Sequence, residues 1–253
     1  MSEIRQALPD AGFVVRSLAT NYRTGTRLDL HRHEWPQLVY AARGVMTVEV
    51  DDGSWVVPAH RAVWVPALAA HTIEMTGAVA MRTLYLAPEL QHGLPDRCET
   101  VEVSPLLREL ILEVVRRGML HRDLPEESRL IGVLLDQLAR IEAAPLRLPL
   151  PRHPRLQSIL SRLRTTPFEE FTLDGLAREA GMSARTLERF FADIDLTFAQ
   201  WRQRRRILHA LRLLAGDAPV TQVALAVGYQ SPSAFIAAFK RELGVTPGEY
   251  HKK

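Results

Sequence analysis

The C-terminal half of the chain repeats one pattern of apolar and small residues. In each copy a short helix with Ala on its inner face ends at a Gly, and the next helix buries two apolar residues spaced i and i+4. The copies pair Leu176-Ala177, Ala180-Gly181, Leu187 and Phe191 with Val223-Ala224, Val227-Gly228, Phe235 and Phe239. Gly suits the left-handed residue that ends a helix, Ser183 and Ser231 are favoured N-caps, and the short turn is typical of a helix-turn-helix. The pattern predicts an all-α domain with two helix-turn-helix units.

The second helix of the first copy, expected over Ala184–Asp193, presents Arg185, Glu188 and Arg189 opposite its buried residues. Arg185 and Arg189 are about one helical turn apart, so both side chains can reach into one major groove. Arg donates to guanine O6 and N7, and Glu accepts from cytosine N4. The alternative is a solvated charged helix face. We predict that these three residues read DNA bases, with Ser183 beside them at the helix start.

The second copy has a different exposed surface. Its reading helix, expected over Pro232–Leu243, presents Ser233 and Ala237 near its start and Lys240 further along. Ser can bond a base or a phosphate, whereas Ala can only touch a thymine methyl group. We predict that Ser231, Ser233 and Lys240 contact DNA here, with weaker sequence discrimination than the first copy has.

A long helix, expected over Phe198–Ala215, joins the two copies. It combines an apolar stripe with five arginines, which are too many to share one side. Arg204 and Arg205 are predicted phosphate contacts, which position a protein on DNA without specifying sequence. At 1.5 Å per residue the helix spans roughly 27 Å, which would separate the two reading helices by about one turn of DNA.

The N-terminal half consists of short β-branched or alternating runs broken by turn residues. The dipeptide Asp51-Asp52 followed by Gly53 separates two such runs and predicts a hairpin. Strands are expected over Val45–Val50, Ser54–Val57, Ala62–Val65, Thr72–Met75 and Met81–Leu86. Many short strands at this spacing predict an all-β sandwich or jelly-roll barrel over residues 1–90. Four aromatic residues are expected in its core, namely Trp35, Tyr40, Trp55 and Trp64.

Histidines within this barrel form a candidate metal site. His31 and His33 lie two residues apart in an expected strand and so point to one face, with Gln37 four residues on and His71 much later. Three imidazoles and one amide oxygen would suit a divalent metal such as Zn, Ni or Fe. The alternative is that these side chains line the barrel mouth or hydrogen-bond one another.

Amphipathic helices are expected after the barrel, over residues 105–120 and 125–142, within a packing or dimerisation segment at 91–144. They can pack on the barrel or on a second copy of the chain, and periodicity does not choose between intrachain packing and a homodimer. Four prolines then favour a stiff, extended linker over 145–154. Such a linker would hold the helical domain at 155–253 at a distance from the barrel without fixing its orientation.

Charge is divided unevenly between the two halves. Residues 150–253 hold 16 Lys and Arg against 10 Asp and Glu, and residues 1–149 hold 16 against 19, although the net charge is only +3. The basic half favours a polyanion partner. Cys98 is the single cysteine, which excludes an intrachain disulfide, and no apolar run is long enough to span a membrane. We expect a cytoplasmic protein with no membrane partner.

The repeated motifs resemble the DNA-binding domain of the AraC/XylS family over residues 155–250. The matching positions include Leu176-Ala177, Gly181-Met182-Ser183, Leu187, Arg189, Phe191, Ala210-Leu211, Val223-Ala224, Val227-Gly228-Tyr229, Phe235, Phe239-Lys240-Arg241, Thr246-Pro247 and Tyr250. The resemblance implies that the positions of Arg185, Glu188 and Arg189 face bases. Asp195 stands where the family usually has Gly, and Ala237 and His251 stand where it commonly has Arg.

The barrel is similar to the cupin fold in the spacing of Gly25, His31, His33, Gln37 and Gly44. Cupins usually place Glu at the position of Gln37, and a neutral amide is a poorer metal ligand than a carboxylate. A subgroup of the AraC/XylS family carries such a cupin-like sensor before its DNA-binding domain. The resemblance therefore implies a multidomain protein, with an N-terminal all-β cupin-like barrel and following helices, and a C-terminal all-α domain.

We expect a sequence-specific transcriptional regulator, and not an enzyme, that binds double-stranded DNA as an activator or repressor. It would respond to a small-molecule effector or a metal through the barrel and act as a homodimer, with RNA polymerase as a further partner if it activates. The alternative is a metal-dependent cupin enzyme carrying a DNA-binding tail. That enzyme would need a nearby acid or base, whereas Glu34 is expected on the opposite face from the histidines. In a third interpretation the barrel is only an oligomerisation scaffold.

Overall fold

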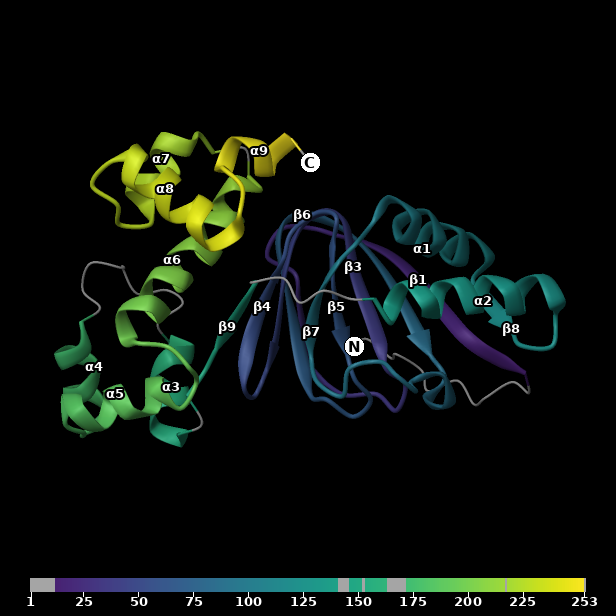
Figure 1. Ribbon diagram of the computed structural model, residues 1–253, viewed down its shortest axis with the longest axis horizontal. Coiled ribbons are helices and arrows are strands. Elements are labelled where there is room, and N and C mark those ends of the chain that lie inside the picture. Colours follow the sequence, from purple (N-terminus) through teal and green to yellow (C-terminus); the bar gives the residue numbers. More distant parts are fainter. Residues whose placement is uncertain (1–11, 141–145, 152, 163–171, 217, 253) are drawn as a thin grey trace.

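The computed structural model of the chain describes residues 12–140, 146–151, 153–162, 172–216 and 218–252. The N-terminal part is a strand-rich barrel, and the helical C-terminal part lies along one side of it (Figure 1). Ile141 and Pro145 fall within the helix and the linker that we predicted, but they lie outside the described residues.

Within the described residues, nine strands form one sheet with antiparallel pairing. They are β1 (Phe13–Tyr22), β2 (Arg27–His31), β3 (Gln37–Val50), β4 (Gly53–Val57), β5 (Arg61–Val65), β6 (His71–Leu86), β7 (Glu99–Glu102), β8 (Met119–His121) and β9 (Arg147–Pro149). The hydrogen-bonded path is β7-β5-β3-β6-β1-β8, with β2 beside β6 and β4 between β3 and β9. The predicted hairpin is confirmed, since Val50 of β3 pairs with Gly53 of β4 across Asp51-Asp52.

Alternation along β3 places successive side chains in different cores, as the period of two requires. Leu38 and Tyr40 pack toward helices on the outer face, whereas Val39 and Ala41 face the barrel interior. Tyr40, Trp55 and Trp64 are buried as predicted, and Trp35 is only partly buried. The barrel therefore has a filled interior and a second apolar layer on its outer face.

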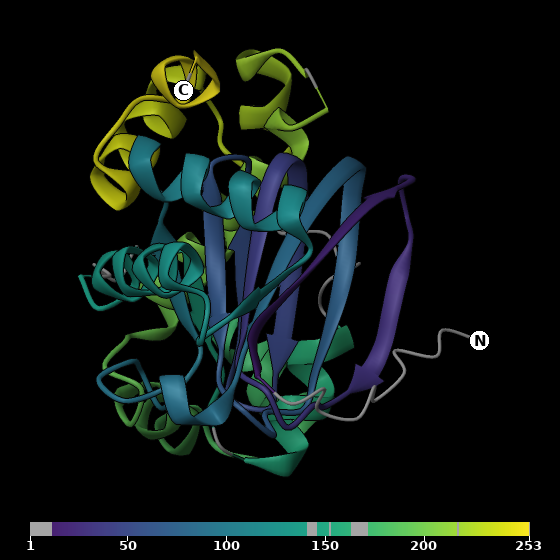
Figure 2. The same cartoon turned by 90° about the vertical axis from the view of Figure 1, so that its right-hand side faces the viewer.

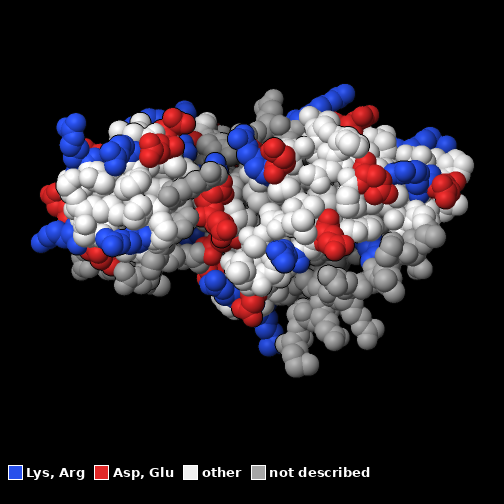
Figure 3. Space-filling model, turned by 90° about the horizontal axis from the view of Figure 1, so that it is seen from below, with Lys and Arg blue, Asp and Glu red and all other residues white. Residues whose placement is uncertain are grey.

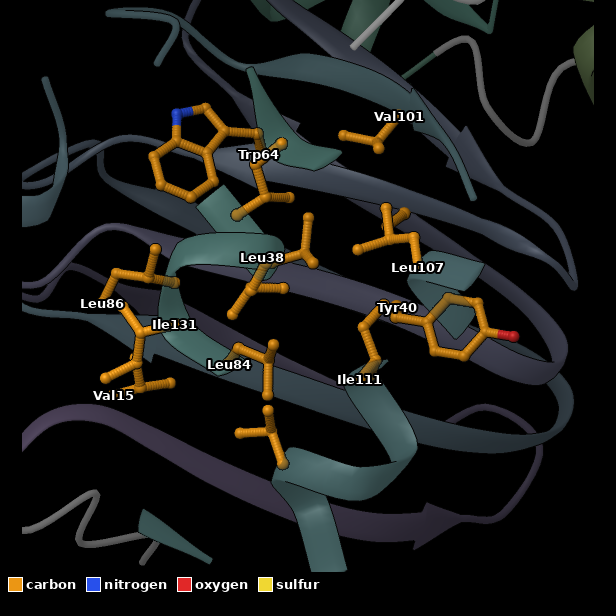
Figure 4. Close-up of a cluster of buried hydrophobic side chains, with 14 of the residues drawn as sticks. Val15, Leu38, Tyr40, Trp64, Leu84, Leu86, Val101, Leu107, Ile111 and Ile131 are labelled. Carbon is orange, nitrogen blue, oxygen red and sulfur yellow. The ribbon is translucent and has the colours of Figure 1, made fainter. Parts of the chain in front are cut away.

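Two helices cover that outer layer, namely α1 (Pro105–Arg117) and α2 (Pro125–Leu138). They cross one face of the sheet side by side (Figure 2). Leu107 and Ile111 of α1 and Ile131 of α2 point into the cluster around Leu38 (Figure 4). Ser104 caps α1 by accepting a hydrogen bond from the Leu107 amide. Packing on the barrel thus accounts for the inner stripe of both helices.

The strand-rich part continues past residue 90, where we expected the barrel to end. β7 pairs with β5 and β8 pairs with β1, so both strands belong to the sheet. The predicted helix over 105–120 ends earlier, because Gly118 takes a left-handed φ of 85° and the chain enters β8. The short 3-10 helix η1 (Pro88–Leu90) lies before β7.

The helical part has the predicted double arrangement. Its elements are α3 (Pro154–Arg162), α4 (Leu173–Ala180), α5 (Ala184–Ala192), α6 (Phe198–Leu214), α7 (Val220–Ala226), α8 (Pro232–Leu243) and α9 (Pro247–Lys252). Gly181 ends α4 in the left-handed region, and Thr197 and Gln200 form a capping box at the start of α6. The two helix-turn-helix units lie at opposite ends of α6 (Figure 1).

The linker does not keep the two parts at a distance, which corrects our prediction. β9 pairs with β4 at the sheet edge, and the Trp201 indole Nε1 donates to the carbonyl of Pro149 at 2.8 Å. Val45 and Val56 of the barrel share one apolar cluster with Ile207 and other residues of α6. An extended segment exposes unpaired backbone groups, and here the edge of the sheet satisfies them. α6 is consequently packed against the barrel.

Candidate functional site

The first reading helix, α5, has the exposed face that its sequence predicts. Leu187 and Phe191 are fully buried, while Arg185, Glu188 and Arg189 on the other side are exposed. The hydroxyl oxygen of Ser183 accepts a hydrogen bond from the Thr186 amide at 3.1 Å, so Ser183 is the N-cap of α5 and lies beside that face. The arrangement brings together all four residues that we predicted to contact DNA in this unit.

The second reading helix, α8, carries a less charged face. Ser231 is its N-cap, since its hydroxyl oxygen accepts from the Ala234 amide at 3.3 Å. Ser233 and Lys240 are exposed on the side away from the core, as predicted. Ile236 lies on the same side and is 36% exposed. Ile236 was not among the predicted DNA contacts. Its spacing of three from Ser233 nevertheless indicates that it lies on the same side of the helix.

Arg204 and Arg205 of α6, for which we predicted phosphate contacts, differ in their surroundings. Arg204 Nε lies 2.5 Å from Oε1 of Glu242 on α8, and this ion pair joins the two helices. Arg205 is 7% exposed, and its burial, followed by the nearby charges of Arg212 and Arg206, lowers its pKa to about 10. The burial of Arg205 contradicts its predicted phosphate contact, since the helical period alone cannot show which side of α6 is buried; for Arg204, which is partly exposed, the phosphate contact stays a prediction.

The barrel meets α6 through a polar patch on the outer face of β3 and β6. Thr47 pairs with Glu74 across the two strands, and Glu49 pairs with Thr72. Arg212 Nε donates to the Thr47 hydroxyl oxygen at 3.1 Å. Burial lowers the pKa of Arg212, and the negative charge of Glu74 opposes that shift. The basic stripe of α6 is therefore held against a partly acidic strand surface.

Acidic side chains also lie along the boundary between the two parts. Figure 3 shows red side chains there, and both blue and red ones around the helical part. A cavity of about 470 Å³ between β4, β9 and the α5–α6 turn is lined by Asp52, Asp193 and Asp195, with Arg147 and Arg204. Carboxylates repel phosphate, so DNA is expected to approach the helices from the side away from this boundary.

His209 lies beside Arg212 on α6, and its protonation should make the stability of the folded chain depend on pH. Burial, with the charges of Arg212 and Arg205, lowers the pKa of His209 from 6.5 to about 4. Between these pH values the unfolded chain gains a proton that the folded chain does not, so the free energy of unfolding should fall as the pH drops through this window. Denaturant titrations at several pH values should show a smaller fall for His209→Gln, by about 2 kcal/mol. Part of the fall should remain, because burial also lowers the pKa of His71 to about 4. An unchanged pH profile in the variant would contradict this assignment.

The three candidate metal-ligating histidines come together at one end of the barrel. The ligand atoms of His31, His33 and His71 all lie within 4.8 Å of one another. Each ring is oriented by a backbone carbonyl that contacts its Nδ1 atom. The distances are 2.7 Å from His31 to Asp29 O, 2.5 Å from His33 to Trp35 O and 2.8 Å from His71 to Ala69 O. A carbonyl oxygen can only accept, so Nδ1 carries the proton in each ring and Nε2 presents its lone pair. This tautomer is the one that a metal ligand needs.

Gln37 completes the cluster through its carbonyl oxygen. Its amide nitrogen donates to the Thr83 hydroxyl at 3.1 Å and to the Tyr85 hydroxyl at 2.9 Å. Thr83 itself donates to the carbonyl of Leu38, so it accepts from Gln37 and fixes the amide orientation. Gln37 Oε1 then faces His33 Nε2 at 2.9 Å. Burial lowers the pKa of His33, and the contact with Gln37 opposes that shift; in the neutral ring with Nδ1 protonated, two lone pairs would lie opposite each other.

A cation fits this donor set. It would relieve the repulsion between Gln37 Oε1 and His33 Nε2, and it would use Nε2 of His71, a buried atom with no hydrogen-bond partner among the described residues. Imidazole nitrogens with one neutral oxygen suit Zn, Ni or Fe in the divalent state. Glu34 is exposed, as predicted, and does not join the cluster.

Known proteins match both parts of the chain. Residues 14–166 match the AraC-like ligand binding domain, and residues 176–253 match a helix-turn-helix domain. The chain is 36% identical over 222 residues to the HTH-type transcriptional regulator NimR of Escherichia coli K12, covering 87% of this chain and 81% of NimR. It is 33% identical over 201 residues to the RCS-specific HTH-type transcriptional activator RclR of the same organism, covering 73% and 71%. Among solved structures, that of ToxT from Vibrio cholerae is similar over 94% of this chain and 98% of the ToxT chain, with 9% sequence identity and a TM-score of 0.41.

These relatives are transcriptional regulators, and the comparisons give no support to the alternative of a cupin enzyme with a DNA-binding tail. In the part of the chain that the structure describes, no helix is long and apolar enough to cross a membrane. The helical part supplies the DNA-binding units, and the barrel is the ligand-binding domain. The chain belongs to the AraC family of DNA-binding transcriptional regulators.

Proposed function

We propose that this regulator binds a divalent metal at His31, His33 and His71, with Gln37 as a fourth ligand, and that metal occupancy controls its binding to DNA. The convergence of one ring nitrogen from each of three histidines, each ring held by a carbonyl at Nδ1, carries this proposal. A bound metal would supply positive charge between Gln37 Oε1 and His33 Nε2, which lie 2.9 Å apart. A small-molecule effector could then bind beside the metal or in its place.

The barrel strands offer a direct route from this site to α6. His71 begins β6, and Ile73 and Met75 follow it on the inner face. Thr72 and Glu74 lie on the outer face, where Thr72 donates to Glu49 at 3.2 Å and Glu74 lies near Arg212. A shift of His71 on binding would move these neighbours, because alternate residues of one strand share a rigid backbone. The proposed signal therefore passes from β6 to α6.

Metal analysis and DNA binding together test this proposal. Purified wild-type protein should hold about one metal ion per chain, and His33→Ala should lose it, because a small site that loses one of its four ligands binds the metal much more weakly. His92→Ala is the control, since His92 is exposed on a loop outside the cluster. Treatment with a chelator should change the affinity of wild-type protein and of His92→Ala for a selected DNA operator. The same treatment should leave the affinity of His33→Ala unchanged. Metal binding without any change in DNA affinity would contradict metal control.

We further propose that Arg185, Glu188 and Arg189 read bases, with Ser183, Ser231, Ser233 and Lys240 in supporting contacts. Their joint exposure on α5 and α8, at the two ends of α6, supports two contacts in successive major-groove segments. Selection of bound fragments from random double-stranded DNA should recover a bipartite site. Where the protein activates transcription, RNA polymerase is the partner that we propose.

Exposed apolar residues on the helices that cover the barrel support a homodimer. Leu106 of α1, Leu124 before α2 and Val133 of α2 are 53%, 47% and 41% exposed. We expect the double variant Leu106→Ser and Val133→Ser to shift the protein toward the monomer in sedimentation experiments, because it removes apolar area from the interface. Leu225→Ser, at an exposed apolar residue of α7, is the matched control. A wild-type protein that stays monomeric at micromolar concentration would contradict the dimer.

A further inference from the structure

The two helix-turn-helix units can be compared position by position through their buried residues. Leu187 and Phe191 of α5 occupy the same places as Phe235 and Phe239 of α8, four residues apart and fully buried in each unit. Counting from these anchors, Arg185, Glu188 and Arg189 of α5 correspond to Ser233, Ile236 and Ala237 of α8. Each of the three reading positions is charged in the first unit and uncharged in the second.

The exposed face of α8 is mostly apolar where it would meet a base. Ser233, Ile236, Ala237 and Lys240 follow the spacing i, i+3, i+4 and i+7, which places them on one side of the helix. The core lies on the opposite side, at Phe235, Ala238 and Phe239. Core packing therefore does not explain why Ile stands at position 236, where it is 36% exposed.

Only one feature of a base edge in the major groove favours an aliphatic side chain, and that is the C5-methyl group of thymine. Ile236 and Ala237 have no side-chain donor or acceptor, so they cannot replace the water that guanine, cytosine or adenine edges would lose. Lys240 on the same side adds a charge suited to a phosphate, which favours DNA over a protein partner for this face.

We infer that α8 selects thymine through methyl contacts with Ile236 and Ala237, whereas α5 selects guanine and cytosine through hydrogen bonds. The inference rests on the proposed reading of DNA by both helices and assigns a composition to each half of the operator. The second unit discriminates among sequences by shape and apolar contact. It is then more than the weakly specific support that its lack of arginine suggests.

Replacing thymidine with deoxyuridine tests this inference, because uracil keeps the base pair and loses only the methyl group. In the operator recovered by selection, one substitution at a contacted thymine of the α8 half should weaken binding about threefold to fivefold, the factor expected for losing one buried methyl. Substitutions in the α5 half should change affinity less than about twofold. Affinities are measured with the full-length chain by fluorescence anisotropy.

Two variants assign the effect to a residue. Ile236→Ala should bind the thymine operator more weakly and should show a smaller difference in affinity between the thymine and uracil operators, because only Ala237 then contacts the methyl groups. Glu188→Ala, at the matching position of α5, should keep the full uracil effect. Both residues are exposed, and thermal unfolding of each variant checks that the fold is retained.

The outcomes separate the inference from the proposed function. Failure to recover any specific fragment would overturn base reading by this protein, and the methyl contact with it. Specific binding with equal affinity for thymine and uracil throughout the α8 half would overturn the inference alone. A uracil effect that is undiminished in Ile236→Ala would also overturn it, because Ile236 would then contribute no methyl contact.

Discussion

Replacing both Arg185 and Arg189 with Ala should remove most of the preference of this protein for its operator. Both side chains are exposed on α5, opposite the buried Leu187 and Phe191. A bidentate contact between Arg and guanine contributes about 1–3 kcal/mol of discrimination, so the double variant should lose roughly 2–6 kcal/mol on the operator. Random DNA offers only phosphate contacts, and there the loss should be much smaller. Dissociation constants on both DNAs, at one fixed salt concentration, measure the difference.

The matched control is Arg178→Ala, which removes the same charge from the neighbouring helix α4. Arg178 is exposed, and its Nε donates to the carbonyl of Asp174 within its own helix. Its loss should weaken binding to the operator and to random DNA to a similar, small extent. If the double variant also weakened both DNAs equally, Arg185 and Arg189 would be phosphate contacts and the assignment of base reading would be wrong.

Trp201→Ala should destabilise the chain by about 3–5 kcal/mol, as expected for removing a buried tryptophan. Trp201 is 1% exposed and packs against Phe191, with ring centroids 5.6 Å apart. Its indole Nε1 also donates to the carbonyl of Pro149 in β9, which pairs with β4 of the barrel. Trp201 thus joins the core of the first reading unit to the segment at the sheet edge. Denaturant unfolding of wild-type and variant measures the loss.

Trp201→Phe separates packing from the hydrogen bond. Phenylalanine keeps an aromatic ring next to Phe191 but leaves the Pro149 carbonyl without the indole donor, a cost of about 1–3 kcal/mol for a buried group. The Phe variant should lie between wild-type and Trp201→Ala. A Phe variant as stable as wild-type would mean that the contact with Pro149 contributes nothing to the junction.

Local patterns predicted the helices and the exposed face of α5 well. Ser183 and Gly181 mark helix ends through their own chemistry, so α4 and α5 could be located to within a residue. For these helices the determinant lies within a few residues. His31 and His33 do converge, but not by strand alternation as we predicted, because β2 ends at His31 and His33 lies between β2 and β3; β6 brings His71 to them.

Features set by distant contacts were missed. β7, β8 and β9 are three or four residues long, and nothing in such short runs indicates the edge strands with which they pair. The prolines of the linker correctly indicate an extended chain but do not show that β4 would bind it. The sequence around Arg205 does not indicate that its side chain is buried, because the burial follows from the packing of α6. Tertiary packing, rather than local preference, decided each of these.

Hydroxyl-radical footprinting of the selected operator tests the central claim most directly, namely that one chain reads DNA with two different helices. Wild-type protein should protect two segments about one helical turn apart on one face of the DNA. Arg189→Ala should lose protection of one segment first, and Ile236→Ala should weaken the other. A single protected segment, or equal loss of both segments in either variant, would contradict the account.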